Sequence, residues 1–394
     1  MTTRRAAPIW TTGATRFAGM PRTHARIGLA LLLIFLAACL SAVTSPGPRP
    51  SGASGSVTAP AASDPPPPGQ TDLLLYQTVV AGIRGGSPYY AVVAGIRGGS
   101  PYYAVVAETH RMGHYPLKPF FTVRLPTLAV VEAALPPMVL NLLLLLLCVG
   151  TILAWVARVR PEMTGLVPLA VAGLLVLAGL YVNLDPGFVV FHEIWAGPLI
   201  ALSLAVRRPG RWLPAVAFGL SAMLIRETAL LYVAIMAVFA WLDGERRETF
   251  GWLGAIAIFA VVLAAHAHAV SLVSGPLDRV SQGWSGLEGF GFYVRLATIS
   301  SGLDILPQWL ASLVLGMALF GWLAWRDAVA TRALVVFAAY AALISLFARS
   351  DNFYWALMTT PVLLVGLVFA VDGLRDMIAA ARDTRRITVT RVIR

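Results

Sequence analysis

Ionisable and aromatic residues gather at a few points of a chain that is otherwise apolar. An ionisable group at membrane depth costs at least ~2.5–3.5 kcal/mol, so such groups usually line a cavity and pair with one another there. Carboxylates, arginines and aromatic rings together suit the binding of an anionic headgroup and of a polyol. The residues in question are Asp72, Tyr89, Tyr102, Arg111, Arg124, His192, Glu193, Arg226, Glu227, Arg349, Asp351 and Trp355.

The composition predicts where these residues must be held. Of 394 residues, 58% are hydrophobic and 12% are charged, whereas a soluble domain carries about 25% charged residues. The apolar residues form blocks long enough to cross about 30 Å of hydrocarbon, and in lipid such blocks must be helices. The sequence therefore predicts an all-α integral membrane protein. The net charge of +11 does not indicate nucleic-acid binding, because the basic residues lie in short loops and at both termini.

The hydropathy predicts about ten transmembrane helices. Lys and Arg concentrate in alternate short loops, which places both termini in the cytoplasm of a multi-pass protein of the bacterial inner membrane. The predicted spans are Ile27–Val43, Pro137–Ala157, Thr164–Val182, Phe188–Val206, Trp212–Ile225, Thr228–Leu242, Phe250–Val270, Leu306–Trp325, Ala333–Ala348 and Tyr354–Val371.

One apolar stretch, Trp212–Leu242, has Arg226-Glu227 at its middle. A single helix of this length would measure ~46 Å, half again the thickness of the hydrocarbon core. We therefore expect two short helices that reverse at Arg226-Glu227.

The chain also divides by composition and carries one internal repeat. The sequence VVAGIRGGSPYYA occurs at 79–91 and again, letter for letter, at 92–104. We expect one copy to belong to the fold and the other to add a loop. The expected regions are a cytoplasmic N-terminal tail (1–26), the first transmembrane helix (27–43), a flexible Pro/Ser/Gly-rich segment (44–70), a periplasmic or interfacial region (71–137), the transmembrane bundle (138–371) and a basic cytoplasmic tail (372–394).

A family resemblance rests on the region that follows the first span. Asp72 is followed by Tyr76, by Gly-x-x-Pro-Tyr-Tyr, by Tyr115-Pro116 and by Arg124-Leu-Pro. This order resembles the first periplasmic loop of bacterial GT-C glycosyltransferases, which are polytopic enzymes that use polyprenyl-phosphate sugars and include mannosyl- and arabinosyltransferase-like branches. The Arg-Glu turn and the segment Arg-Ser-Asp-Asn-Phe-Tyr-Trp at 349–355 are also similar to that group. The resemblance covers most of 71–371.

The resemblance implies a fold, a reaction and roles. It implies a GT-C-like bundle with a periplasmic first loop, and Asp72 as the base that takes the acceptor hydroxyl proton. The arginines and neighbouring polar residues named above would bind the donor phosphate or the substrate, and Tyr89, Tyr102 and Trp355 would stack on sugars. The implied partners are the lipid bilayer, a polyprenyl-phosphate sugar donor and a glycan or lipid acceptor. No metal site is predicted, and a divalent cation stays open as a cofactor.

Other interpretations of the same residues stand beside these. Asp72 precedes an apolar helical run and suits an N-cap. Arg226-Glu227 suits a structural ion pair that closes a hairpin, and His192-Glu193 suits two interfacial residues satisfied by their neighbours. The alternative functions are a polytopic transporter or lipid flippase, and a non-catalytic envelope-assembly protein.

Overall fold

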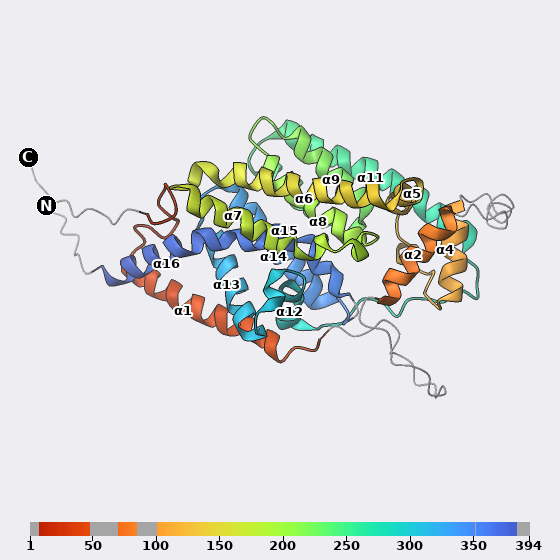
Figure 1. Ribbon diagram of the computed structural model, residues 1–394. Helices are drawn as coiled ribbons and strands as arrows, with labels where there is room; N and C mark the ends of the chain where they lie inside the picture. The colour runs from red at the N-terminus through yellow and green to blue at the C-terminus, as the bar shows by residue number, and fades with distance from the viewer. Residues whose placement is uncertain (1–7, 48–69, 85–100, 351, 384–394) are drawn as a thin grey trace, which may run out of the picture.

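The computed structural model describes residues 8–47, 70–84, 101–350 and 352–383, and over these residues the fold is built from helices (Figure 1). Four helical segments are long and apolar enough to cross a membrane, which indicates a multi-pass membrane protein. Their outward-facing side chains are apolar, as at Leu33 and Val261, which are 69% and 71% exposed. The segments are α1 (Arg22–Cys39, continued to Val43), α6 (Pro137–Val159, continued to Glu162), α11 (Arg246–Val273) and α14 (Ala328–Phe347).

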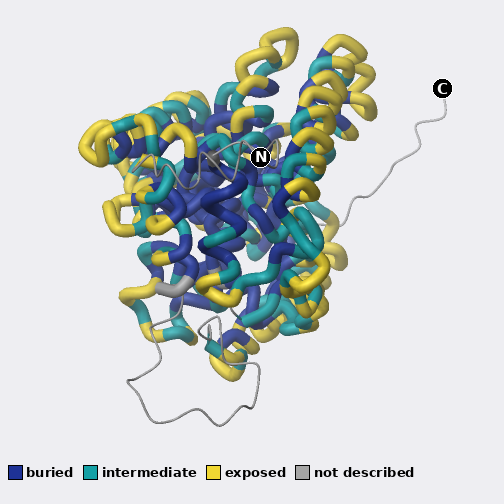
Figure 2. Tube along the Cα trace, turned by 90° about the vertical axis from the view of Figure 1, so that its right-hand side faces the viewer, coloured by how far each residue is buried: buried dark blue, intermediate teal, exposed yellow. Residues whose placement is uncertain are grey.

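Shorter apolar helices pack between these four. One of them, α8, is buried on nearly every side, so it forms the centre of the bundle. Figure 2 shows the buried segments, in dark blue, in the interior of the molecule. Gly197 of α8 allows this packing, because a Cβ there would lie 2.1 Å from the carbonyl oxygen of Leu357. The helices are α7 (Leu166–Gly179), α8 (His192–Val206), α9 (Leu213–Ile225), α10 (Leu230–Leu242), α13 (Gln308–Ala324), α15 (Thr360–Leu363) and α16 (Leu367–Arg382).

Ion pairs define two ends of the bundle. Arg207, which precedes α9, lies 3.7 Å from Asp243, which follows α10. Between them the chain reverses at Arg226, whose backbone is extended, and Arg226 pairs with Glu193 in the first turn of α8. Thus α9 and α10 run in opposite directions, as the length of the stretch predicted. We call the end with Arg207 the terminal end and the end with Arg226 the opposite end.

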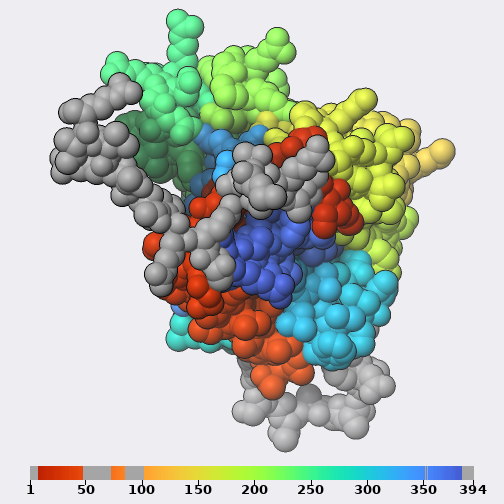
Figure 3. Space-filling model, turned by 90° about the vertical axis from the view of Figure 1, so that its left-hand side faces the viewer, coloured from red at the N-terminus to blue at the C-terminus, as the bar shows by residue number. Residues whose placement is uncertain are grey.

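Both described ends of the chain meet at the terminal end. The backbone N–H groups of Ile9, Trp10 and Thr11 donate to the carboxylate of Asp372, at 2.8 to 2.9 Å. Phe17 stacks on Phe320 at 5.3 Å between ring centroids. Figure 3, which faces this end, shows the red N-terminal residues and α1 against the blue C-terminal helix. Residues 8–21 are therefore packed against the bundle, and α1 begins at Arg22.

Shorter helices outside the apolar spans cover the opposite end (Figure 1). Three of them pack together around a second apolar core that includes Val79, Val105 and Val123. These helices are α2 (Gln70–Arg84), α4 (Pro101–Met112) and α5 (Pro126–Ala134), and α12 (Gly289–Ile299) packs nearby against the turn that follows α1.

The repeat is divided between two of these helices. The first six residues of the first copy, 79–84, end α2, and the last four of the second copy, 101–104, begin α4. The intervening residues lie outside the described part of the chain. Each helix thus takes a different part of the repeated sequence.

Candidate functional site

Four charged side chains meet at the opposite end: Arg124, Glu193, Arg226 and Glu227, which we call the ionic cluster. Arg226 forms short ion pairs with both Glu193 and Glu227. Arg124 Nη1 lies 3.1 Å from Glu227 Oε1. The side chains of Arg226 and Glu193 are each 1% exposed. Removing charges from water is costly, so the mutual pairing is what allows all four to be held here.

The turn between α9 and α10 brings Arg226 and Glu227 into the cluster. The N–H of Arg226 donates to the Ala222 carbonyl at 2.8 Å and so ends α9. A short 3₁₀ turn, Glu227–Ala229, then leads into α10. The Tyr340 hydroxyl donates to the Thr228 carbonyl at 2.9 Å and fixes the turn against α14. Arg226 and Glu227 interrupt the apolar run, and the turn at this interruption places them beside the first turn of α8, where Glu193 lies.

Tyrosines surround the guanidinium of Arg124. Its Nε donates to the Tyr76 hydroxyl at 3.1 Å, and its Nη2 donates to the Tyr354 hydroxyl at 3.4 Å. The Tyr102 hydroxyl donates to the backbone carbonyl of Arg124 at 2.7 Å. The Tyr76 ring also meets the His192 ring edge-on, with centroids 5.3 Å apart. Residues from α2, α4 and the 352–358 segment are thereby joined through one arginine, and α8 contacts them through Tyr76.

Asp72 adjoins this cluster from α2. It lies in the first turn of that helix, one turn before Tyr76, and is 9% exposed. Burial raises the pKa of the Tyr76 hydroxyl to about 12; the nearby Arg124 charge opposes this rise, and the Asp72 carboxylate adds to it. A carboxylate in the first turn also interacts favourably with the helix dipole, so its position suits a structural role as well as a chemical one.

No family model, curated protein or solved structure matches the chain.

The cluster keeps polar atoms that have no hydrogen-bond partner. Oε2 of Glu227 is buried without one, although Oε1 of the same carboxylate meets two arginines. Neither ring nitrogen of His192 has one; the Leu125 backbone approaches the ring, but no hydrogen bond of ordinary geometry forms. Buried polar groups are normally satisfied, so these atoms mark places for a ligand or water. Within the described residues, no group of three His, Cys, Asp or Glu side chains is arranged to hold a metal ion.

Arg111 lies away from the cluster. Its Nε and Nη2 donate to the two carboxylate oxygens of Asp278 at 2.7 and 2.8 Å, and Nη2 also donates to the Val273 carbonyl at 2.8 Å. The hydrogen bonds from Arg111 lower the pKa of Asp278 to about 2. Arg111 therefore ties the end of α4 to the loop that follows α11.

The remaining predicted residues are placed as follows. The backbone N–H of Arg349 donates to Asn352 Oδ1 at 3.2 Å, and Asn352 Nδ2 donates to the Tyr354 hydroxyl at 3.4 Å, which links this segment to the cluster. Trp355 is 8% exposed. The Tyr102 ring is buried and meets Tyr103 edge-on. Tyr89 and Asp351 lie outside the described residues.

Two site residues were missed by the sequence analysis. Tyr76 had a detectable signal, because a residue four positions after Asp72 shares its face of a helix. The signal for Tyr354 was weaker, since nothing in the sequence shows whether Tyr354 or Trp355 faces the site.

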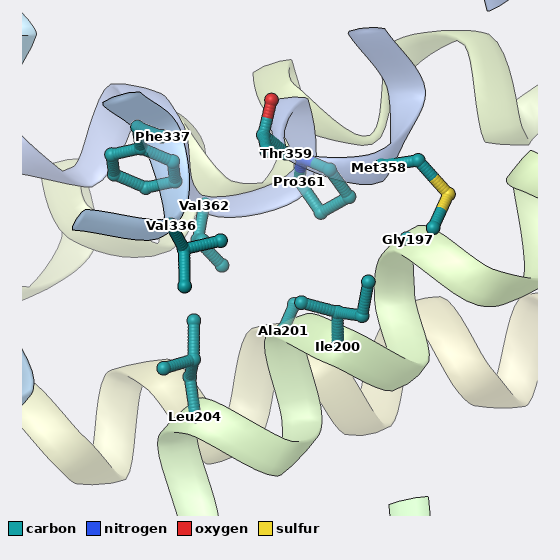
Figure 4. Close-up of a pocket in the computed structure, with 10 residues that line it drawn as sticks. All are labelled: Gly197, Ile200, Ala201, Leu204, Val336, Phe337, Met358, Thr359, Pro361 and Val362. Atoms are coloured by element: carbon teal, nitrogen blue, oxygen red, sulfur yellow. The ribbon is translucent and has the colours of Figure 1, made fainter. Parts of the chain in front are cut away.

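Two of the cavities among the described residues differ in the character of their lining. One, shown in Figure 4, lies between α8, α14 and the 358–362 segment and is lined almost wholly by apolar groups such as Ile200, Phe337 and Met358. The other adjoins the ionic cluster, has about 20 Å³ of space open to the centre of a water-sized molecule, and is lined in part by Arg124, His192 and Glu132. Only the second offers ionisable groups to a ligand.

Proposed function

We propose that the chain is a GT-C-type membrane glycosyltransferase. It would transfer a sugar from a polyprenyl-phosphate donor to a lipid-linked or cell-envelope acceptor on the periplasmic face. The observation that carries the proposal is the buried ionic cluster at one end of the bundle, with Asp72 beside it and unsatisfied polar atoms in it.

The proposal includes an orientation. About ten passes would leave both termini in the cytoplasm of the inner membrane, because arginines concentrate in the loops of the terminal end. The ionic cluster would then lie at the periplasmic side, where lipid-linked sugars are consumed. Replacing Ser350 or Ala328 singly by cysteine, in a variant without Cys39 and Cys148, tests this. An impermeant thiol reagent should label only the Ser350 variant in intact cells, and labelling at Ala328 would reverse the orientation.

The reaction assigns roles to Asp72, Arg124 and Arg226. The Asp72 carboxylate accepts the proton of the acceptor hydroxyl while its oxygen attacks the anomeric carbon. The bond from that carbon to the phosphate oxygen breaks, and the phosphate leaves with the electron pair. Arg124 and Arg226 of the ionic cluster would stabilise this charge. Since Glu227 already pairs with both arginines, donor binding must exchange the Glu227 contact to Arg124 for a phosphate contact.

The decisive experiment uses the purified full chain in liposomes. Radiolabelled polyprenyl-phosphate sugars are supplied with a lipid-linked glycan acceptor, and label in the acceptor is measured. We expect transfer with at least one donor. Movement of labelled donor across the bilayer without transfer would indicate a flippase. If neither transfer nor movement occurs with any donor, the proposal is wrong and a non-catalytic role in envelope assembly replaces it.

A further inference from the structure

The cavity beside the ionic cluster contains a buried acid that the proposed reaction does not use. Glu132 of α5 lines this cavity, is 1% exposed, and has an Oε1 atom without a hydrogen-bond partner. The cavity lies between α2, α4, α5 and the first turn of α8. An unpaired carboxyl group in such a place is costly unless something binds to it.

Two imidazoles face the same space. His192 lines it with both ring nitrogens unpartnered. His110 Nδ1 lies 3.0 Å from the Pro116 carbonyl, a contact that requires an N–H at Nδ1 and leaves Nε2 as an acceptor in the neutral ring. The cavity therefore presents both donors and acceptors, and a hydroxyl group also has both.

The charges around the cavity do not favour an ion. Burial raises the pKa of Glu132 to about 8, with Arg84 opposing the rise, and burial lowers the pKa of His110 to about 4. Both groups are thus mainly neutral at pH 7. Arg84 is engaged by the Glu132 and Leu135 carbonyls. The guanidinium of Arg124 donates to Tyr76, Tyr354 and Glu227, on the side where the proposed function places the donor phosphate.

We propose that this cavity is a binding site for neutral hydroxyl groups, in which Glu132, His110 and His192 are the binding residues. The hydroxyl comes either from water or from the sugar acceptor. The space open to the centre of a water-sized molecule is about 20 Å³, enough for a water or one hydroxyl-bearing arm, and too little for a whole sugar ring. Binding of a hydroxyl group from the sugar acceptor rests on the proposed function. Binding of water does not.

The first arm of the test detects hydroxyl binding without any transferase assay. A brief X-ray pulse generates hydroxyl radicals from bound water, and these oxidise even buried side chains next to it. In the full chain we expect oxidation at Tyr102 and Leu75, which line the cavity and are buried, at least about 5-fold above Tyr340, which is buried elsewhere. Glu132→Gln should keep this labelling, because an amide also binds hydroxyl groups. Glu132→Leu should abolish it.

The second arm identifies the source. If the acceptor places a hydroxyl in the cavity, Glu132→Leu should raise the acceptor KM about 3- to 10-fold, the worth of about one hydrogen bond, and leave the donor KM unchanged. Glu108→Leu is the matched control, since Glu108 is a half-buried residue of α4 that does not line the cavity. If the cavity is labelled and Glu132→Leu leaves the acceptor KM unchanged, the occupant is water.

The outcomes separate the two proposals. If the unaltered protein transfers no sugar but its cavity is labelled, the proposed function fails and the hydroxyl site stands. If the cavity is unlabelled and Glu132→Leu leaves the acceptor KM unchanged, the hydroxyl site is overturned. If Glu132→Leu does not accumulate, the test uses the unaltered protein and Glu132→Gln. Absence of labelling in both would overturn the hydroxyl site.

Discussion

Glu248 and Asp372 at the terminal end differ from Glu227 of the ionic cluster in how their carboxylate oxygens are engaged. At the terminal end, Glu248 receives Arg207 Nε and Nη2 at 3.0 and 2.8 Å and also the indole N–H of Trp252 at 3.2 Å, so both oxygens are engaged. Asp372 likewise uses both oxygens, for backbone N–H groups and for Arg375. At the opposite end, Glu227 concentrates its contacts on one oxygen and leaves the other without a hydrogen-bond partner.

The difference separates structural charges from charges available to a ligand. A carboxylate that is fully engaged has no capacity left, and losing it leaves its partner as an uncompensated buried charge. A carboxylate that is half engaged can exchange a contact at little cost. The comparison predicts that substitution of Glu248 or Asp372 changes stability and that substitution of Glu227 changes activity.

The largest effect is expected at Asp72. Asp72→Asn keeps the shape of the side chain and removes the proposed base, so sugar transfer should fall by about 10²–10⁴-fold with normal accumulation in the membrane. Transfer is measured in liposomes at saturating donor and acceptor. If Asp72 serves only the first turn of α2, the variant should transfer at the parent rate, because an amide caps a helix about as well as a carboxylate. Glu193 would then be the next carboxylate to test.

A matched pair of variants tests the comparison directly. Glu248→Gln leaves Arg207 buried without its main counter-charge and should lower the free energy of unfolding by about 3 kcal/mol. Glu227→Gln should lower it by about 1 kcal/mol or less, since Arg226 keeps Glu193 and Arg124 keeps the Tyr76 and Tyr354 hydroxyls, while reducing sugar transfer. Unfolding is followed in detergent by titration with denaturant. Equal losses of stability in the two variants would remove the distinction between the two ends.

A smaller and pH-dependent effect is expected at Asp278. Its pKa is lowered in the fold to about 2 by Arg111, so the pair stabilises the protein above the ordinary pKa near 4. That contribution is lost as the pH falls from about 4 to about 2, and it amounts to about 1 kcal/mol after allowance for solvent, because Arg111 is 35% exposed. Hydrogen exchange in α4 measures it. Asp278→Asn should abolish this part of the pH dependence, and an unchanged profile would exclude the pair as its source.

The smallest effect is expected for removal of one repeat. Deleting Val92–Ala104 yields the same sequence as deleting 79–91, and it would connect α2 to α4 through Gly85-Gly86-Ser87 with all the described residues of both helices retained in sequence. Loop-closure entropy changes by only about 1–2 kcal/mol for such a shortening. We expect normal accumulation, and activity equal to or above that of the parent. A deletion variant absent from the membrane would show that both copies are structural.

The local sequence predicted most of the helices but only part of the site. Apolar length predicted the long helices, and the charged pair Arg226-Glu227 predicted the reversal, because both depend on neighbouring residues alone. The contact between Arg124 and Glu227 spans 103 positions, and no local pattern encodes such a distance. Arg111 was assigned to the site for its type, but its partner Asp278 lies in a loop that offered no signal. Glu132 was missed, although a lone acid in the apolar run at 128–135 was visible.

The contact of Asp372 with Ile9, Trp10 and Thr11 has a consequence for synthesis of the protein. Its partners are separated by more than 360 positions, and α1 also packs on α16, with Gly28 close to Met377. A ribosome releases the first helix long before it has made the last one. Until α16 is made, α1 therefore lies in the lipid without this neighbour. The N–H groups of Ile9, Trp10 and Thr11 lack their acceptor, Asp372, for the same period. Closure of the bundle at this contact is thus a late step of assembly, and a chain that stops before Asp372 cannot make it.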